Sequence, residues 1–298
     1  MSTLFDGDIY AGLSGLELEE EFFDLGGGIT LRKTYAHLMA PFMVAFKPAP
    51  PGRHHPGPLK AASGGFSFDI NAELLIPSHI EEQYGSKIDI ARTLVFLLRL
   101  GVNPAITLPV FSNYPFASIP EIPNSQSTLF PFEVQSRHFP LGVIGGKANA
   151  DSLAWVTDRW QTVYRMTSES TEFSLAVEAI DMGQFVKNTA LTMVSLWGAL
   201  EALFSPAPYE LRFRVSSLIA SYLEAPGVER EKCQREVFKL YDKRSAAAHG
   251  KPKHTSEDVL GTFNLLRRVL MQIIDRKKVP SKNDLEGMLF GSFLHKDS

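Results

Sequence analysis

An arginine and a histidine stand close together in the stretch LYDKRSAAAHGKP, residues 240–252. The guanidinium of Arg244 can hold two phosphate oxygens in a planar fork. An imidazole such as that of His249, with a reference pKa of about 6.5, exchanges protons near neutral pH. Such a pair suits metal-free cleavage of RNA, because one group moves a proton of the 2′-hydroxyl or leaving oxygen while the other stabilises charge on the phosphate.

The spacing of the two residues sets a geometric condition. On a continuous helix, residues five positions apart point about 140° away from each other. The segment between them is Ser-Ala-Ala-Ala, whose small side chains leave the surface open. If the helix tightens or frays before Gly250, His249 can turn toward Arg244. Three successive alanines also allow another helix to approach closely, as a composite site at a dimer interface requires.

A structural explanation of the same residues stays open. A cation in the last turn of a helix is favoured by the helix dipole. A histidine beside a C-terminal glycine is commonly part of a helix cap, and charges along an amphipathic helix usually face solvent. Gly250 and Pro252 would then simply end the helix.

The charge balance points to a local basic patch. The 298-residue chain has a net charge of −3, so any contact with nucleic acid must come from one region of the surface. Residues 230–253 contain eight Lys or Arg and three acids, and a fourth acid, Glu229, lies just before this range.

The residues after about position 150 have the periodicity of helices. We expect helices over 150–166, 170–181, 184–204, 209–224, 228–245, 256–277 and 283–293, separated by Pro and Gly turns. Thr255 and its successors Ser-Glu-Asp predict an N-terminal cap for the last long helix.

The first half of the chain predicts strands. Residues 28–38, 66–75 and 105–111 mix β-branched and aromatic residues, while 48–58 (PAPPGRHHPGP) predicts a loop and Leu25-Gly-Gly-Gly a tight turn. One helix is expected over 88–101. The fold class is therefore α+β, with an N-terminal strand-rich domain (1–149) and an all-α helical domain (150–298).

Several classes of function are disfavoured. The single cysteine, Cys233, can form neither an internal disulfide nor a multi-thiolate zinc site, and His54-His55 lacks spaced metal-ligating partners. The segment GVIGGKA (142–148) lacks the spacing of a phosphate-binding Gly-Lys loop. No signal peptide or membrane span is expected, and we predict a cytoplasmic protein without metal or cofactor.

From Arg244 to His249 the sequence resembles the R-x4–6-H motif of HEPN domains (higher eukaryotes and prokaryotes nucleotide-binding). The surroundings are similar to the ApeA-like branch of the family, which is associated with bacterial abortive phage infection. The matching segments are LWGALEALF (196–204), ELRFRVSSLIASYL (210–223) and LYDKRSAAAHG (240–250). The resemblance covers roughly residues 170–278.

The resemblance implies an antiparallel helical bundle that dimerises and brings two motifs into one cleft. Many members are metal-independent endoribonucleases that leave 2′,3′-cyclic phosphate ends. Arg244 and His249 would be catalytic. Glu201 would orient Arg244 or satisfy a buried basic group, with Ser245 and Tyr241 as further supporting residues. The candidates for lining an RNA groove, each equally explained as surface or as an ion-pair partner, are Lys243, Arg212, Arg214 and Lys251.

The expected partners are RNA, a second copy of the chain and a phage-derived trigger at the N-terminal domain, which would sense the trigger or restrain the dimer. No membrane partner is expected. Two alternatives stay open: a HEPN module that binds nucleic acid or protein without cleavage, and a purely structural bundle in which the motif is accidental.

Overall fold

The computed structural model describes residues 6–123, 126–138, 147–204, 211–248 and 254–291. The chain divides into two compact units. The first takes in Met1–Ala91, Ile106–Val134 and Gly146–Leu153, and the second Arg92–Ala105, Gln135–Gly145 and Ala154–Ser298. Residues 92–105 and 135–145 thus belong to the helical unit although they precede residue 150.

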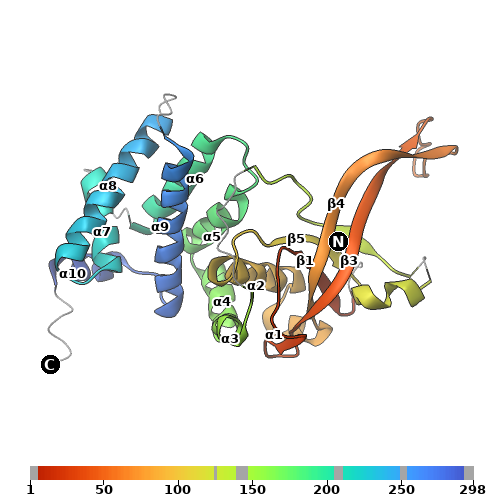
Figure 1. The fold of residues 1–298 in the computed structure, drawn as a ribbon, viewed down its shortest axis with the longest axis horizontal. Helices are drawn as coiled ribbons and strands as arrows, with labels where there is room; N and C mark the ends of the chain where they lie inside the picture. The colour runs from red at the N-terminus through yellow and green to blue at the C-terminus, as the bar shows by residue number, and fades with distance from the viewer. Residues whose placement is uncertain (1–5, 124–125, 139–146, 205–210, 249–253, 292–298) are drawn as a thin grey trace. The chain divides into compact units, whose positions relative to one another are not determined.

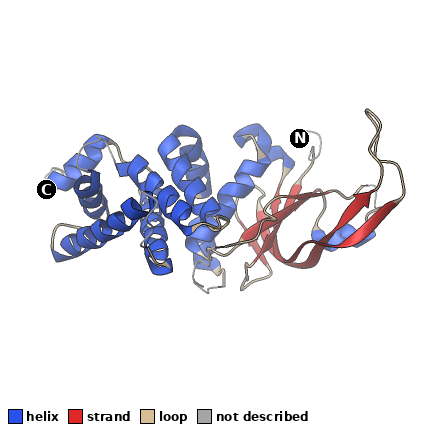
Figure 2. Cartoon of the chain, turned by 90° about the horizontal axis from the view of Figure 1, so that it is seen from above, coloured by secondary structure: helices blue, strands red, loops and turns tan. Residues whose placement is uncertain are grey.

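The first unit is built on an antiparallel sheet (Figures 1 and 2). The order of its strands is β2-β3-β4-β1-β5-β6. Their bounds are β1 (Ile9–Ser14), β2 (Phe22–Asp24), β3 (Thr30–Ala45), β4 (Leu59–Ile76), β5 (Thr107–Ser112) and β6 (Leu129–Pro131). A short helix α1 (Glu81–Tyr84) and two 3-10 turns, Ser78–Ile80 and Phe116–Glu121, complete it.

Strand β1 was not predicted, and its surroundings explain why. It pairs with β4 on one side and β5 on the other, and Ile9, Ala11 and Leu13 are fully buried. Gly12 lies so close to Phe116 that an added Cβ would stand 2.7 Å from the ring carbon Cζ. Ile9, Ala11 and Leu13 share one face. On the other face Gly12 is buried and Tyr10 is partly buried, so the strand lacks the alternation of apolar and polar residues that marks a half-exposed strand.

The strand predicted over 28–38 begins two residues before β3, and the one predicted over 66–75 lies within β4; both strands are longer than expected. The predicted loop over 48–58 lies between them. The tight turn before β3 is confirmed, since Gly26, Gly27 and Gly28 all have positive φ angles, of 82°, 65° and 82°. Residues that have a Cβ atom rarely adopt a positive φ, so the turn favours glycine at all three positions.

The second unit is helical (Figure 1). The chain enters it within α2 (Lys87–Gly101), and the other helices are α3 (Ala150–Thr157), α4 (Trp160–Glu169), α5 (Thr171–Gly183), α6 (Thr189–Phe204), α7 (Leu211–Leu223), α8 (Val228–Ala248), α9 (Ser256–Asp275) and α10 (Lys282–Phe290). An antiparallel sheet followed by these helices confirms the α+β class.

Most helix boundaries differ from the prediction by a few residues, and three differences have consequences for the site or the core. The helix expected over 150–166 is divided between α3 and α4. The one expected from residue 184 begins at Thr189, because the side chain of Asn188 accepts a hydrogen bond from the backbone of Ala190 at 2.9 Å and caps the helix. The third, α8, continues through Ala248, beyond the predicted end at 245. The predicted cap at Thr255 is confirmed as a capping box with Asp258.

Helix α6 forms the centre of the helical core. It packs against α5, α8 and α9, and Leu196, Trp197 and Leu200 are completely buried. Val269 and Leu270 of α9 are buried to the same extent. Packing of these apolar side chains fixes the relation of α6 to its neighbours. Of the predicted site residues, Glu201 lies on α6, and Tyr241, Arg244 and Ser245 lie on α8.

The sheet contains one fully buried carboxylate, that of Glu73 in β4. It pairs with the guanidinium of Arg32 in β3 and accepts a hydrogen bond from the backbone N–H of Phe116 at 2.6 Å. Loss of the carboxylate would leave that buried N–H without its partner.

We therefore expect Glu73→Ala to lower the free energy of unfolding by about 3 kcal/mol. The control is Glu21→Ala, which removes an exposed ion pair with Lys33 and should change stability by less than about 0.5 kcal/mol. Chemical denaturation of both variants measures the difference, and equal stabilities would contradict a structural role for Glu73.

Candidate functional site

Helix α8 carries the predicted arginine near its C-terminal end. Glu229 and Glu231 occupy its first turn, where acidic side chains suit the positive end of the helix dipole. Cys233, Val237 and Tyr241 are buried against the rest of the bundle. Because Tyr241 and Arg244 are three positions apart on a helix, they lie on the same face.

Glu201 of α6 joins both of these residues. Its Oε2 lies 2.8 Å from an Nη atom of Arg244, and its Oε1 accepts a hydrogen bond from the Tyr241 hydroxyl at 2.9 Å. Only 18% of the Glu201 side chain and 24% of the Arg244 side chain are exposed. The carboxylate thus holds the guanidinium in one orientation with little exposure to solvent.

Tyr241 is fixed by packing as well as by this hydrogen bond. Its ring meets the indole of Trp197 edge-on with centroids 5.0 Å apart, and the guanidinium carbon of Arg244 lies 5.5 Å from the ring centroid. Burial, and then the hydrogen bond to Glu201, raise the pKa of Tyr241 to about 12. The phenol therefore stays protonated at neutral pH and acts as a hydrogen-bond donor.

Arg244 keeps hydrogen-bonding capacity beyond its ion pair. A guanidinium has five N–H donors, and the buried Nε atom of Arg244 makes no hydrogen bond to the residues that the structure describes. Because this nitrogen is buried, an anion would meet the exposed part of the guanidinium, which Glu201 already orients.

The two residues that precede Arg244 on α8 form ion pairs with other helices. Asp242 binds Arg212 of α7 at 3.0 Å, and the Arg212 guanidinium carbon lies 3.6 Å from the ring centroid of Phe238. Lys243 Nζ lies 3.4 Å from the Oδ2 atom of Asp258 in α9. Two of the predicted RNA-binding cations are therefore engaged in ion pairs, as the alternative explanation anticipated.

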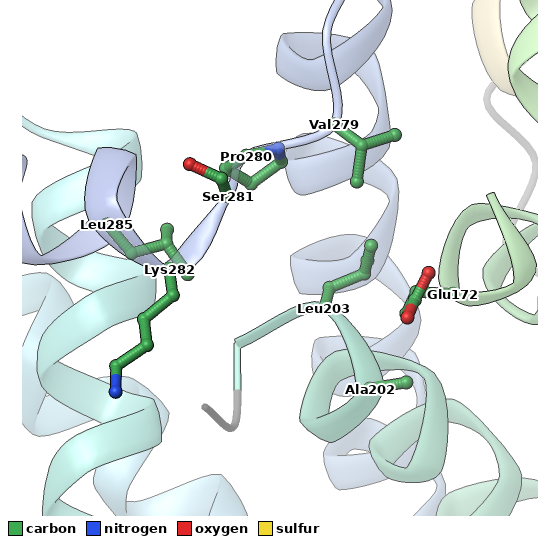
Figure 3. Close-up of a pocket in the computed structure, with 8 residues that line it drawn as sticks. All are labelled: Glu172, Ala202, Leu203, Val279, Pro280, Ser281, Lys282 and Leu285. Atoms are coloured by element: carbon green, nitrogen blue, oxygen red, sulfur yellow. The ribbon is translucent and has the colours of Figure 1, made fainter. Parts of the chain in front are cut away.

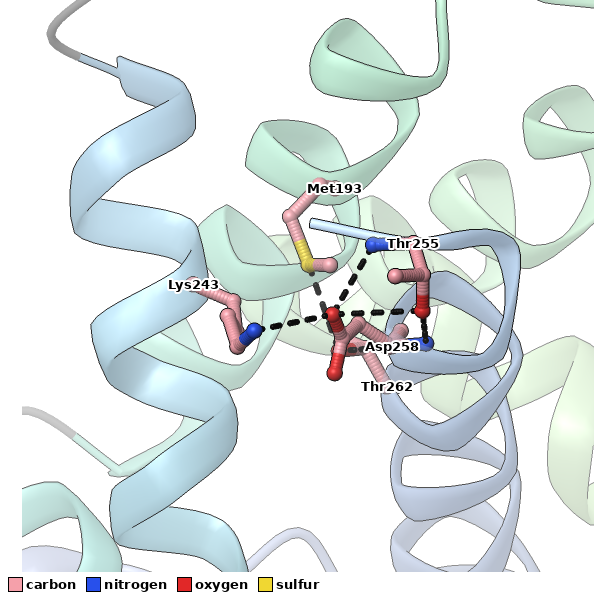
Figure 4. Close-up of polar contacts among 5 residues, drawn as sticks. All are labelled: Met193, Lys243, Thr255, Asp258 and Thr262. Atoms are coloured by element: carbon pink, nitrogen blue, oxygen red, sulfur yellow. Dashed lines mark hydrogen bonds and ion pairs between the residues drawn. The ribbon is translucent and has the colours of Figure 1, made fainter. Parts of the chain in front are cut away.

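Asp258 is the centre of a polar cluster between α6, α8 and α9 (Figure 4). It accepts a hydrogen bond from the backbone of Thr255 at 2.9 Å and receives Lys243 from the facing helix. Burial opposes its ionisation, but these partners outweigh burial and lower the pKa of Asp258. Beneath it, the hydroxyl of Thr262 donates to the sulfur of Met193 at 3.3 Å.

The other predicted residues have separate surroundings. Ser245 directly follows Arg244 in α8 and is half-buried. Arg214 lines a hollow of about 200 Å³ with Phe213 and Phe290, away from the contacts of Arg244. His249 and Lys251 lie outside the described residues, so the pairing of His249 with Arg244 stays a prediction.

A second histidine was missed by the sequence reasoning. His254 precedes α9, and its Nε2 lies 3.0 Å from the hydroxyl of Thr189 at the start of α6. Its buried Nδ1 has no hydrogen-bond partner among the described residues. In the sequence, His254 is distinguished only by its position just before the N-terminal cap of α9. The spacing of the R-x4–6-H motif does not include this position.

The helical unit also contains a cavity of about 350 Å³ beside the start of α10 (Figure 3). Its wall includes Leu203, Leu285, Glu172 and Lys282. None of the predicted site residues that the structure describes lines this cavity. A hollow that holds one acid and one amine among apolar groups does not by itself indicate a reaction.

Among the described residues, no group of three or more His, Cys, Asp or Glu is arranged to hold a metal ion. No helix in this part of the chain combines the length and apolar character needed to cross a bilayer. Comparison of the chain with protein-family models, with curated proteins and with solved structures gave no match.

The hydrogen bond between Glu201 and Tyr241 can be tested by titration. We expect Glu201→Gln to lower the pKa of Tyr241 from about 12 toward the ordinary value of about 10, because the variant removes the negative charge that opposes phenolate. The shift is only partial, since burial is the larger cause. Tyrosinate absorbance in the ultraviolet measures it, and Tyr241→Phe identifies the signal.

Tyr222 supplies an internal control, because burial raises its pKa to about 12 without any contribution from Glu201. Its titration should be the same in the protein and in Glu201→Gln. An unchanged titration of Tyr241 would contradict the hydrogen bond. Since the folded pKa of Tyr241 lies above the unfolded one, its contribution to stability is complete below pH about 10 and is lost as pH rises through about 12.

Proposed function

We propose that this protein is a HEPN-type endoribonuclease that cleaves RNA without a metal ion. The observation that carries the proposal is the Arg244 side chain, which is held by Glu201, is partly exposed and has a donor atom without a partner among the described residues. The proposal also rests on the sequence, which places His249 five residues after Arg244.

The role of Arg244 is to bind and stabilise the phosphate. A guanidinium oriented before substrate binds needs no reorganisation as negative charge develops on the phosphate oxygens. Glu201 fixes that orientation through one Nη atom, and the exposed part of the Arg244 side chain is left for the substrate. Glu201 is thus a positioning residue, and Arg244 is the residue that contacts RNA.

The role of His249 is proton transfer. The reaction requires a base to take the proton of the 2′-hydroxyl and an acid to protonate the departing 5′-oxygen. Tyr241 is unsuited as the base, because a pKa of about 12 keeps its phenol protonated. The imidazole is the side chain whose ordinary pKa suits both transfers near neutral pH.

The bond changes balance within the RNA. The 2′-oxygen attacks the adjacent phosphorus as its proton passes to the base. The bond from phosphorus to the 5′-oxygen breaks, and that oxygen receives a proton. The products are a 2′,3′-cyclic phosphate and a 5′-hydroxyl, so no water or metal-bound hydroxide is consumed in this step.

A dimer would supply the second set of groups. Residues five positions apart on a helix diverge by about 140°, so a complete site is more readily assembled from two copies. Ser245 and the alanines that follow are small and would let a partner helix approach α8. Lys243, Arg212, Arg214 and Lys251 are the candidates for binding RNA beside the cleft.

We propose the same setting as the resemblance implies, a cytoplasmic effector of bacterial abortive infection. In that setting the N-terminal strand-rich region responds to a phage-derived trigger or restrains the helical dimer. Uncontrolled RNA cleavage would harm the host cell, which gives a reason for a regulatory unit in the same chain.

A module that binds nucleic acid or a protein without cleaving RNA is the second candidate. The ion pair between Arg244 and Glu201 favours the absence of cleavage, because a carboxylate next to the guanidinium reduces its stabilisation of the negative charge that develops on the phosphate. Cleavage separates the two candidates, since both predict binding.

The test is incubation of the purified protein with labelled single-stranded RNA in EDTA. We expect cleavage to 2′,3′-cyclic phosphate ends, and a loss of at least about 100-fold in rate for both Arg244→Ala and His249→Ala. The matched control is Arg235→Ala, which removes an exposed arginine of the same helix that pairs with Glu231.

Full activity of either site variant would refute the proposed site. Binding of RNA without cleavage, weakened in Arg244→Ala, would instead favour the binding module. The unfolding midpoint of each variant shows whether a lost rate reflects the chemistry or the fold.

The dimer has its own test. Sedimentation of the protein at micromolar concentration should show a dimer, and the specific activity should fall on dilution as the dimer dissociates. Mixing inactive Arg244→Ala with inactive His249→Ala should restore part of the activity if one cleft draws on both chains. A fully active monomer would contradict the composite site.

A further inference from the structure

The hairpin of β3 and β4 extends beyond the rest of the sheet. In β3, the residues that pair with β2 are Thr30–Arg32. In β4, the residues that pair with β1 are Ala72–Ile76. Among the described residues, 39–45 and 59–67 form strand pairs only with each other. We call these two segments the outer ribbon, and Figure 1 shows β3 and β4 continuing together as a long curved pair.

The outer ribbon and the residue after it expose large apolar side chains. Phe42, Met43 and Phe46 are each at least 60% exposed, although the ordinary position of such side chains is the core. The complete set is Met39, Phe42, Met43, Val44, Phe46 and Leu59. Contiguous exposed apolar surface marks an interaction site with protein or membrane.

These side chains lie on both faces of the ribbon. Phe42 is paired with Ala62 and Met43 with Ala61, and successive residues of a strand point to opposite faces. A protein surface docked on one face would leave the other apolar face in water. A medium that surrounds the ribbon, such as the boundary layer of a bilayer, covers both faces.

The charge of this region selects the kind of surface. Residues 25–68 contain five Lys or Arg and three His but no Asp or Glu, whereas the whole chain has more acids than bases. Lys47, Arg53 and Lys60 are exposed in and beside the loop that joins the strands. We call the loop over 46–58 the tip. With these cations, the tip and the adjoining strand ends complement an anionic surface.

Lipid suits the tip better than nucleic acid does. Binding to nucleic acid is dominated by cation contacts to phosphates, but here six exposed apolar side chains accompany three exposed Lys or Arg. Interfacial lipid binding combines apolar burial with attraction to anionic headgroups. Residues 48–58 also include five prolines, which have no backbone N–H to desolvate.

We propose that the outer ribbon and its tip insert shallowly into the interface of a bilayer that contains acidic phospholipids. Phe42, Phe46 and Met43 enter the boundary between headgroups and acyl chains. Lys47 and Lys60 stay at the level of the phosphates. This site is independent of the proposed RNA cleavage, because it lies in the other compact unit.

The test uses the full chain and sedimentation with vesicles of phosphatidylcholine alone or mixed equally with phosphatidylglycerol. We expect binding to the mixed vesicles and at least about tenfold weaker binding to neutral ones. Phe42→Ser combined with Phe46→Ser should weaken binding by about tenfold or more. Phe290→Ser, which changes a phenylalanine that is 80% exposed in the helical unit, should leave it unchanged.

The two faces and the charges have separate variants. Met43→Ser with Leu59→Ser tests the opposite face and replaces the first pair if that protein does not fold. Lys47→Glu with Lys60→Glu should abolish the preference for acidic vesicles. Absence of vesicle binding, or binding that none of these variants weakens, overturns the proposal. Binding of RNA that these variants abolish, without vesicle binding, also overturns it and assigns the ribbon to nucleic acid.

Discussion

Three consecutive residues of α8 form ion pairs with three different helices, and the geometry of the candidate site depends on this arrangement. Asp242 reaches α7, Lys243 reaches α9 and Arg244 reaches α6, through Arg212, Asp258 and Glu201. Successive residues of a helix point about 100° apart, so the three pairs hold α8 from three sides. Each partly exposed pair contributes at most about 1 kcal/mol, but together they oppose rotation of the helix about its axis. The direction of Arg244 is thereby set before any ligand binds.

Glu201 has two opposite effects on the same site. Its carboxylate orients the guanidinium and the phenol, and its charge also reduces the positive potential that a phosphate meets. An arginine without such a partner would attract anions more strongly but would move among many rotamers. The structure therefore favours a precisely directed contact over a strong long-range field, which fits a protein whose net charge is −3.

The long helices were the elements that the sequence predicted most completely. The helices from α5 to α10 follow an apolar periodicity and end at Pro, Gly or a capping residue, and the α+β class followed from them and from the first-half strands. β1 was missed because Gly12, on the face opposite Ile9 and Leu13, is also buried, so its sequence does not alternate between apolar and polar residues. At the site, the sequence proposed Glu201, Tyr241 and Arg244, which the structure brings together. The ion pairs of Arg212 and Lys243 with acids on neighbouring helices could not be predicted. They depend on how two helices pack against each other, and the periodicity of a single helix gives no information about that packing.

The long hairpin also separates local from global stability. Beyond Met39 its strands pair with no third strand in the described part of the chain. Its backbone hydrogen bonds can therefore open from the loop inward while β1, β4 and β5 stay paired at the base. Amide protons there should exchange along a gradient that rises toward the loop, without passage through the unfolded state. Mutations in this hairpin can then accumulate with little effect on the thermal stability of the sheet. Its length and composition can therefore evolve to suit its binding partner.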